Sequence, residues 1–274
     1  MNITEIIKNA SVFPAKNLET LSIYAILSIL TVAFAFQGIV TFVFGLLDMG
    51  NILFGVIYII VAIIIGLITR RISIQCIKSG IDLEEKLPDF KWWQSFGMGL
   101  NKVIITIFYF IVPAFLVVVV GLITNIYGNI INLGQEIVSQ IPNAIIGNSA
   151  LASDTIYLAS YPLLISLAIT ISFALIIFLI FSFFQAMGEA RLAHTGSLKH
   201  ALNIYGAAKD ISRIGVGKVI LLSIIIYVIF VIVEIVLTVI FDHLLVLSIL
   251  TIVITPYMAL FSQRSFGLLY SDIV

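Results

Sequence analysis

Charged residues are scarce in this sequence of 274 residues, where only 10% are Asp, Glu, Lys or Arg. A soluble domain usually has about a quarter charged and about half apolar residues. Here 61% of the residues are hydrophobic and the mean hydropathy is +1.21, so a soluble fold is excluded. The single cysteine, Cys76, excludes an internal disulfide and any metal site built from several cysteines.

Six continuous apolar runs are long enough to cross a bilayer as helices. A span needs about 20 apolar residues, because each rises about 1.5 Å through a hydrocarbon core about 30 Å thick. None of the runs alternates in the manner of a barrel strand. We therefore predict an all-α, polytopic integral membrane protein that forms a single membrane domain over residues 1–274. The predicted spans are 21–47, 52–69, 103–124, 161–184, 219–241 and 244–261.

The distribution of charge predicts the orientation of these spans. All 14 lysines and arginines fall in the N-terminal stretch, the loops at 70–102 and 185–218, and the C-terminal tail, which lie on one side of the predicted membrane. The charged residues on the other side are all acidic. Because basic residues are retained on the cytoplasmic side, both termini are predicted to be cytoplasmic in the plasma membrane of the cell.

Three segments outside the spans are amphipathic. Residues 71–80 and 198–214 lie in the two inner loops and mix isoleucines with basic residues, which is typical of helices in the headgroup region. In the outer loop at 125–160, isoleucines and a leucine recur every three or four residues over 126–141. We predict that this third helix lies flat on the membrane.

Motifs for catalysis or metal binding are missing from the sequence. It has no CxxC, HExxH or nucleophile elbow. Glu189, Arg191, His194 and His200 suggest acid–base chemistry, but the two histidines are six residues apart and do not share a helix face, as a zinc pair would require. We therefore expect no catalytic residue, no metal site, no cofactor and no enzymatic activity.

Glu234 is the one ionisable residue placed well inside a predicted span. Charge at such a depth is costly and calls for a partner. Tyr227, Glu234 and Thr238 are spaced to share one helical face with Ser223. Thr251 of the last span lies at the depth of Glu234, so we predict a Glu234–Thr251 hydrogen bond. Whether this group is functional or only a link between helices is left open.

A short motif follows the second span. Gly80 precedes the run Leu87-Pro88-Asp89-Phe90, and Trp92 and Trp93 come after it. With these residues the sequence resembles a domain-of-unknown-function family of polytopic membrane proteins common in methanogenic archaea, over nearly the whole chain. The resemblance implies a six-helix membrane fold and a prokaryotic, archaeal plasma membrane, and it implies no activity.

Three functions remain from the sequence. The first is a structural or accessory membrane component, favoured by the amphipathic belt and the missing site motifs. The alternative is a permease or channel component for a small solute or ion, favoured by Glu234 and by Pro113, Pro162 and Pro256 in or near the spans. A lipid-acting membrane enzyme comes last. The expected partner is the lipid bilayer, nucleic acid is not expected, and a homo-oligomer is left open.

The orientation can be tested by cysteine labelling in a Cys76→Ser background. A cysteine at position 135, in place of Gln135, should react with an impermeant maleimide applied outside the cell. One in place of Lys86 should react only after permeabilisation. The opposite labelling pattern would overturn the predicted topology.

Overall fold

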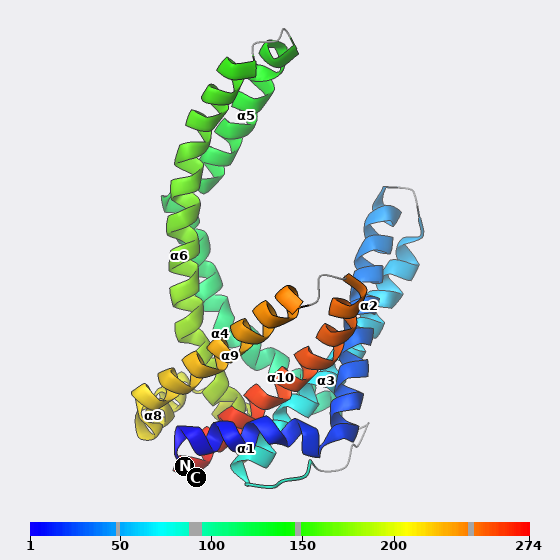
Figure 1. Cartoon of the computed structure of the whole chain (residues 1–274), viewed down its shortest axis with the longest axis vertical. Helices are drawn as coiled ribbons and strands as arrows, with labels where there is room; N and C mark the ends of the chain where they lie inside the picture. Colours follow the sequence, from blue (N-terminus) through cyan, green and yellow to red (C-terminus); the bar gives the residue numbers. More distant parts are fainter. Residues whose placement is uncertain (48–49, 88–94, 146–148, 241–243) are drawn as a thin grey trace. The chain divides into compact units, whose positions relative to one another are not determined.

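The computed structural model describes the backbone of residues 1–47, 50–87, 95–145, 149–240 and 244–274. Its long elements are all helices in this part of the chain, which confirms the all-α fold class (Figure 1). The elements are α1 (Ile3–Lys16), α2 (Leu18–Leu46), α3 (Ile52–Ile81), α4 (Ser95–Ile123), α5 (Ile126–Ile145), α6 (Ser149–Thr195), α7 (Leu198–Ala201), α8 (Ile204–Ile214), α9 (Val216–Ile240), α10 (Leu244–Tyr270) and a final 3₁₀ turn, η1 (Ser271–Ile273).

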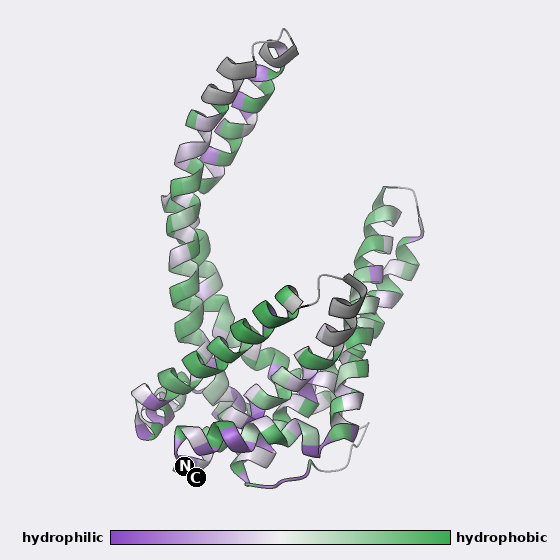
Figure 2. Cartoon of the chain, viewed as in Figure 1, coloured by the Kyte–Doolittle hydropathy of each residue, from purple (hydrophilic) through white to green (hydrophobic). Residues whose placement is uncertain are grey.

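Five of the described helices, α2, α3, α4, α6 and α9, are long and apolar enough to cross a membrane. Hydrophobic residues cover most of their length (Figure 2), and many of their large apolar side chains are exposed on the protein surface. Exposed apolar surface on this scale is stable in lipid and not in water. The chain is therefore a multi-pass membrane protein. The sixth predicted span, 244–261, falls within α10, but the side chains of 244–250 and 252 lie outside the described residues, so this span stays a prediction.

The helix α3 continues well beyond the predicted end of the second span. We predicted a separate interfacial helix over 71–80, whereas the structure has these residues as the last turns of α3. Ile72, Ile74, Cys76 and Ile77 are at most 2% exposed, and Arg71 is 6% exposed. This segment is therefore packed against other helices of the protein instead of lying at the lipid headgroups, and Arg71 is buried within it.

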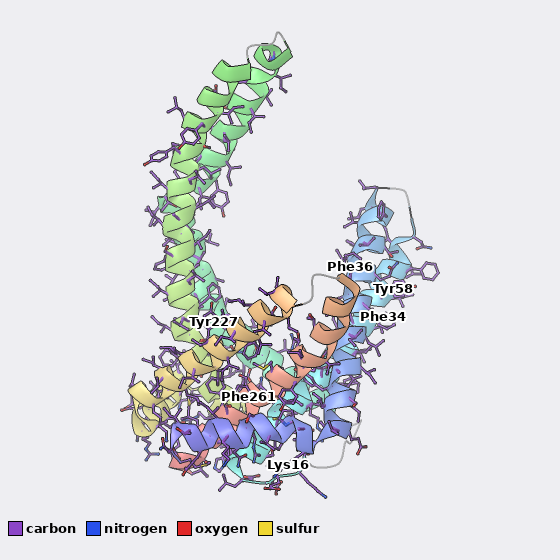
Figure 3. All side chains as sticks on the ribbon, in the orientation of Figure 1. Lys16, Phe34, Phe36, Tyr58, Tyr227 and Phe261 are labelled. Carbon is purple, nitrogen blue, oxygen red and sulfur yellow. The ribbon has the colours of Figure 1, made fainter. Side chains whose placement is uncertain are left out.

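The chain forms two compact units, residues 1–106 with 184–274 and residues 107–183. Most of the buried hydrophobic side chains belong to the first unit, where α1, α2, α3 and α10 pack together. Phe13 of α1, Ile72 and Cys76 of α3 and Leu260 of α10 lie in one cluster. The Sγ of Cys76 donates a hydrogen bond to the carbonyl oxygen of Leu260 at 3.3 Å. On the α2–α3 hairpin, the rings of Phe34 and Tyr58 face one another with centroids 6.0 Å apart (Figure 3).

Two glycines bring α3 and α10 into backbone contact. A Cβ atom built on Gly267 would lie 2.2 Å from the carbonyl oxygen of Ile77 and 2.9 Å from the Cα of Gly80. Small residues at helix crossings allow this close approach in membrane proteins. The contact fixes the register of α10 on α3 and brings Arg264, one turn before Gly267, beside Ser79.

The second unit is a hairpin of α4 and α6 extended by α5. Asn125, at φ +55°, separates α4 from α5, and asparagine tolerates this left-handed conformation better than most residues. Figure 1 shows α5 running antiparallel to the first part of α6. The Nδ2 of Asn129 donates to Ser166 Oγ at 3.1 Å, and Thr124 and Thr170 share a hydroxyl hydrogen bond at 3.1 Å. Asn129 thus attaches α5 to α6, and the orientation of this helix flat on the membrane stays a prediction.

Replacing Gly267 with alanine tests the contact between α3 and α10. We expect Gly267→Ala to lower the free energy of unfolding by about 1–3 kcal/mol, the usual cost of overpacking, because its methyl group would overlap the α3 backbone. Gly217→Ala is the matched control, since nothing lies within 4 Å of the added Cβ. Thermal unfolding in detergent measures both, and equal melting temperatures for the two variants would contradict the crossing.

Candidate functional site

A buried ion pair joins α4 to α6 in the first unit. Lys102 Nζ lies 3.1 Å from Glu189 Oε2, and the two side chains are only 10% and 7% exposed. Gln185 lies one turn before Glu189 and donates to its Oε1 at 3.0 Å, while the same amide also donates to Thr106 Oγ1 at 3.1 Å. The charge of Lys102 is therefore paired inside the protein.

A second ion pair holds α8 against α6, and a hydrogen bond from Tyr270 adds α10 to the same contact. Arg191 Nη1 donates to Asp210 Oδ2 at 2.8 Å, and Tyr270 Oη donates to the same oxygen at 3.1 Å. Burial and the neighbouring Asp210 carboxylate together raise the pKa of Tyr270 to about 12. Tyr270 therefore remains a neutral donor at physiological pH. The helix over 204–214 confirms that part of the amphipathic helix predicted for 198–214.

The four residues that suggested acid–base chemistry, Glu189, Arg191, His194 and His200, each contact a different part of the protein. Glu189 pairs with Lys102, and Arg191 pairs with Asp210. The ring of His194 lies 6.4 Å from that of Tyr270, and His200 contributes a backbone carbonyl to Arg191 Nε at 3.0 Å. The side chains of Glu189 and Arg191 therefore stabilise helix contacts through different partners, and His200 takes part through its backbone.

The two ends of the chain meet at a third charged cluster (Figure 1). Asp272 accepts from the terminal amine of Met1 through Oδ1, at 2.5 Å, and from Lys218 Nζ through Oδ2. Burial acts to raise the pKa of Asp272, but the hydrogen bonds from Lys218 and the amine outweigh it and lower the pKa below its ordinary 3.8. The carboxylate is consequently ionised at neutral pH and ties α1, α9 and η1 together.

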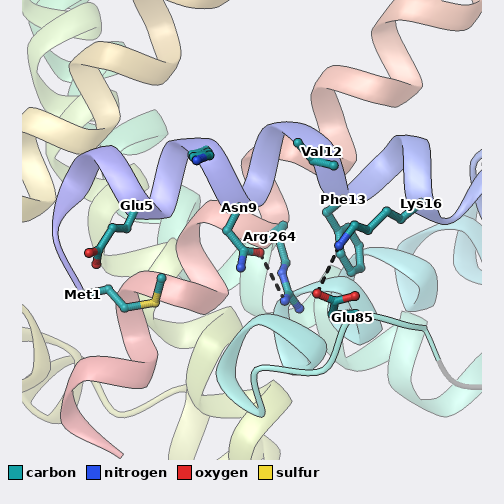
Figure 4. Close-up of a pocket in the computed structure, with 9 residues that line it drawn as sticks. Met1, Glu5, Asn9, Val12, Phe13, Lys16, Glu85 and Arg264 are labelled. Atoms are coloured by element: carbon teal, nitrogen blue, oxygen red, sulfur yellow. Dashed lines mark hydrogen bonds and ion pairs between the residues drawn. The ribbon is translucent and has the colours of Figure 1, made fainter.

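A pocket of about 390 Å³ lies between α1, the loop after α3 and α10 (Figure 4). Arg264 is the deepest of its charged side chains, at 1% exposure. Its Nη1 donates to Ser79 Oγ at 3.0 Å, its Nη2 donates to Asn9 Oδ1 at 3.4 Å, and its guanidinium carbon lies 4.4 Å above the Phe13 ring. At the edge of the pocket, Lys16 Nζ is 3.0 Å from Glu85 Oε1. The pocket is lined by Met1, Glu5, Lys8, Asn9, Val12, Phe13, Lys16, Glu85 and Arg264.

The predicted intramembrane residues lie elsewhere. Glu234, Tyr227 and Thr238 are all exposed on α9, and Tyr227 is 70% exposed (Figure 3). Among the described residues, Glu234 contributes only its carbonyl oxygen, which accepts from Thr238 Oγ1 at 2.8 Å. Thr251 lines a different feature, an apolar groove of about 540 Å³ between α2 and α10. The Glu234–Thr251 hydrogen bond stays a prediction, because the side chains beside Thr251 lie outside the described residues.

Sequence reasoning missed the pocket at Arg264, although two signals were present. The pair Asn2 and Glu5 has the spacing of a capping box, and Glu5 Oε2 accepts from the Asn2 amide at 3.0 Å to begin α1. Ile6, Ala10 and Phe13 follow at helical spacing and are at most 2% exposed. These signals indicate a packed N-terminal helix, but no local pattern shows that Arg264 would lie beneath it.

Long apolar helices with paired charges near their polar ends define the chain as an α-helical, multi-pass membrane protein. A family model described as "Protein of unknown function (DUF4013)" matches residues 54–241, and the chain belongs to this family. This match confirms the resemblance to an uncharacterised family that the residues around Gly80 indicated. The matched region is shorter than expected, since the resemblance was predicted to cover nearly the whole chain. Searches of curated proteins and of solved structures give no significant match.

The pair formed by Lys102 and Glu189 can be tested by a double-mutant cycle. We expect Lys102→Met or Glu189→Gln alone to destabilise the protein by about 3–5 kcal/mol, because each leaves an uncompensated buried charge. The double variant should recover most of that loss. Additive effects of the two substitutions in thermal or denaturant unfolding would show that the ion pair does not form.

Proposed function

We propose that the protein is a structural or accessory component of an archaeal plasma membrane, with both termini cytoplasmic and no catalytic activity. The observation that carries this proposal is the pairing of buried charges between helices, at Lys102–Glu189 and Arg191–Asp210. An enzyme would instead need groups converging on substrate. These ion pairs fit a scaffold whose charged residues hold helices in place.

The proposed orientation rests on the basic residues. The N-terminus, Lys218 and Asp272 meet in one cluster, which fits a common cytoplasmic side for the two termini. Because arginine and lysine are retained inside during insertion, the pocket at Arg264 would open on the cytoplasmic side of the membrane. The bilayer is the proposed partner, with no role for nucleic acid, and the proposal leaves the oligomeric state open.

A permease or channel component is the second candidate, and Glu234 favours it. This carboxyl group is exposed on α9, a helix apolar enough to span. An acidic side chain deep in a bilayer costs about 2.5–3.5 kcal/mol on insertion scales and often marks an ion or proton path. Neither the pocket at Arg264 nor the groove at Thr251 includes Glu234 in its lining, which favours the accessory role.

Reconstituted protein can distinguish the two functions. We expect proteoliposomes that contain the wild type or Glu234→Gln to show the same proton and cation flux as empty liposomes under an imposed potential. Both proteins should also unfold at the same temperature, because the amide keeps the size and hydrogen-bonding capacity of the acid. Tyr227→Phe, on the same face of α9, is the matched control. The accessory role would be contradicted if the wild type and Tyr227→Phe both show a flux that Glu234→Gln lacks. That result would support a transport role.

A further inference from the structure

We propose that the pocket between α1 and α10 binds a phosphate-class oxyanion, which contacts the guanidinium of Arg264 and the amine of Lys8. The ligand is either the phosphate of a lipid headgroup or free phosphate, since the same groups would recognise both. This inference goes beyond the proposed membrane role and does not depend on it.

The charge of Arg264 is the first reason. Its side chain is almost fully buried, yet among the described residues no carboxylate lies within ion-pair distance of it. In contrast, the cations of Lys102 and Arg191 in the first unit are each paired with a carboxylate. Glu84 and Glu85 attract this charge only from beyond that distance. A buried charge without a directly paired opposite charge is costly, and arginine cannot relieve the cost by losing its proton. An anion in the pocket would remove this cost.

The hydrogen bonds of Arg264 are the second reason. A guanidinium has five N–H donors. Two of its nitrogens, Nη1 and Nη2, donate to the neutral oxygens of Ser79 and Asn9, while Nε is buried without a hydrogen-bond partner. Stacking on Phe13 fixes the plane of the group. A planar guanidinium with unused donors matches the oxygen geometry of phosphate.

The shape and charge of the pocket are the third reason. Its volume of about 390 Å³ lies within the range of small-ligand sites. Its lining includes three basic side chains and two acidic ones. Both acids have other contacts, since Glu85 is paired with Lys16 and Glu5 accepts from the Asn2 amide. Lys8 lines the pocket, has no ion pair among the described residues, and supplies a second positive charge to a bound anion.

Most positions along α1 belong either to the pocket or to the core, and Phe13 belongs to both. Met1, Glu5, Asn9, Val12 and Lys16 recur every three or four residues and line the pocket. The buried residues that hold α1 on the protein, such as Ile6 and Ala10, lie on another face of the helix. Substitution of Lys8, which is exposed, therefore changes the pocket without disturbing the contacts of α1 with the core.

The test uses the purified full-length protein, freed of lipid in a zwitterionic detergent. One arm titrates inorganic phosphate and follows the melting temperature. The other arm adds phosphatidylglycerol or phosphatidylcholine and counts bound lipids by native mass spectrometry. We expect at least one of the two phosphate sources to bind the wild type, with phosphatidylglycerol preferred over phosphatidylcholine if the source is a lipid. Binding in the first arm alone identifies free phosphate, and binding in the second identifies a headgroup.

Variants then locate the site. Arg264→Gln and Lys8→Gln should each weaken binding of that anion by about tenfold or more, as expected for the loss of a hydrogen bond to a charged group. Lys209→Gln, an exposed lysine on α8, should leave binding unchanged. If Arg264→Gln does not fold, Lys8→Gln decides the outcome. Unchanged binding in Lys8→Gln and in folded Arg264→Gln, or no binding of either source to the wild type, would overturn the proposal.

Discussion

Backbone contact between α3 and α10 determines where the buried charges of the first unit lie. At Gly80 and Gly267 the two helices are too close for any side chain to fit between them. This approach places Arg264 against Ser79 and leaves Cys76 facing Leu260. The α1 helix then covers the same region through Phe13, whose ring lies under the guanidinium. The pocket and its positive charge are thus consequences of one tight helix crossing.

Paired charges at the polar ends of the helices hold the helices together, as hydrophobic packing does in the core of a soluble protein. Lipid is as apolar as a leucine side chain, so burial of apolar surface gives helices in a bilayer little reason to associate. Ion pairs and hydrogen bonds between specific positions then define which helices meet. Lys102 with Glu189 joins α4 to α6, and Arg191 with Asp210 joins α6 to α8. Because these pairs are specific, they also select one arrangement of these helix ends.

The sequence predicted the spanning helices well because each depends on a local run of apolar residues. The predicted span at 52–69 is contained in α3, and the one at 219–241 agrees with α9 apart from its last residue, which lies outside the described part of the chain. Segments at the helix ends were harder. The isoleucines of 71–80 have the same pattern whether they face lipid headgroups or another helix, and only α10 decides between the two. Partners of Lys102, Arg191 and Arg264 are distant in sequence, so no local pattern could assign them.

Arg264 and Glu234 are the two charged side chains that best separate the possible roles of the protein. Arg264 is enclosed by protein and keeps its charge at any physiological pH, so its need for an opposite charge is permanent. Glu234 is exposed on an apolar helix that is long enough to span the membrane, where an acidic side chain is costly. A permanent positive charge lining a pocket is suited to holding an anionic ligand, whereas an acidic side chain inside a span often marks a path for ions or protons. A binding or scaffolding role therefore depends on Arg264, and a transport role would depend on Glu234.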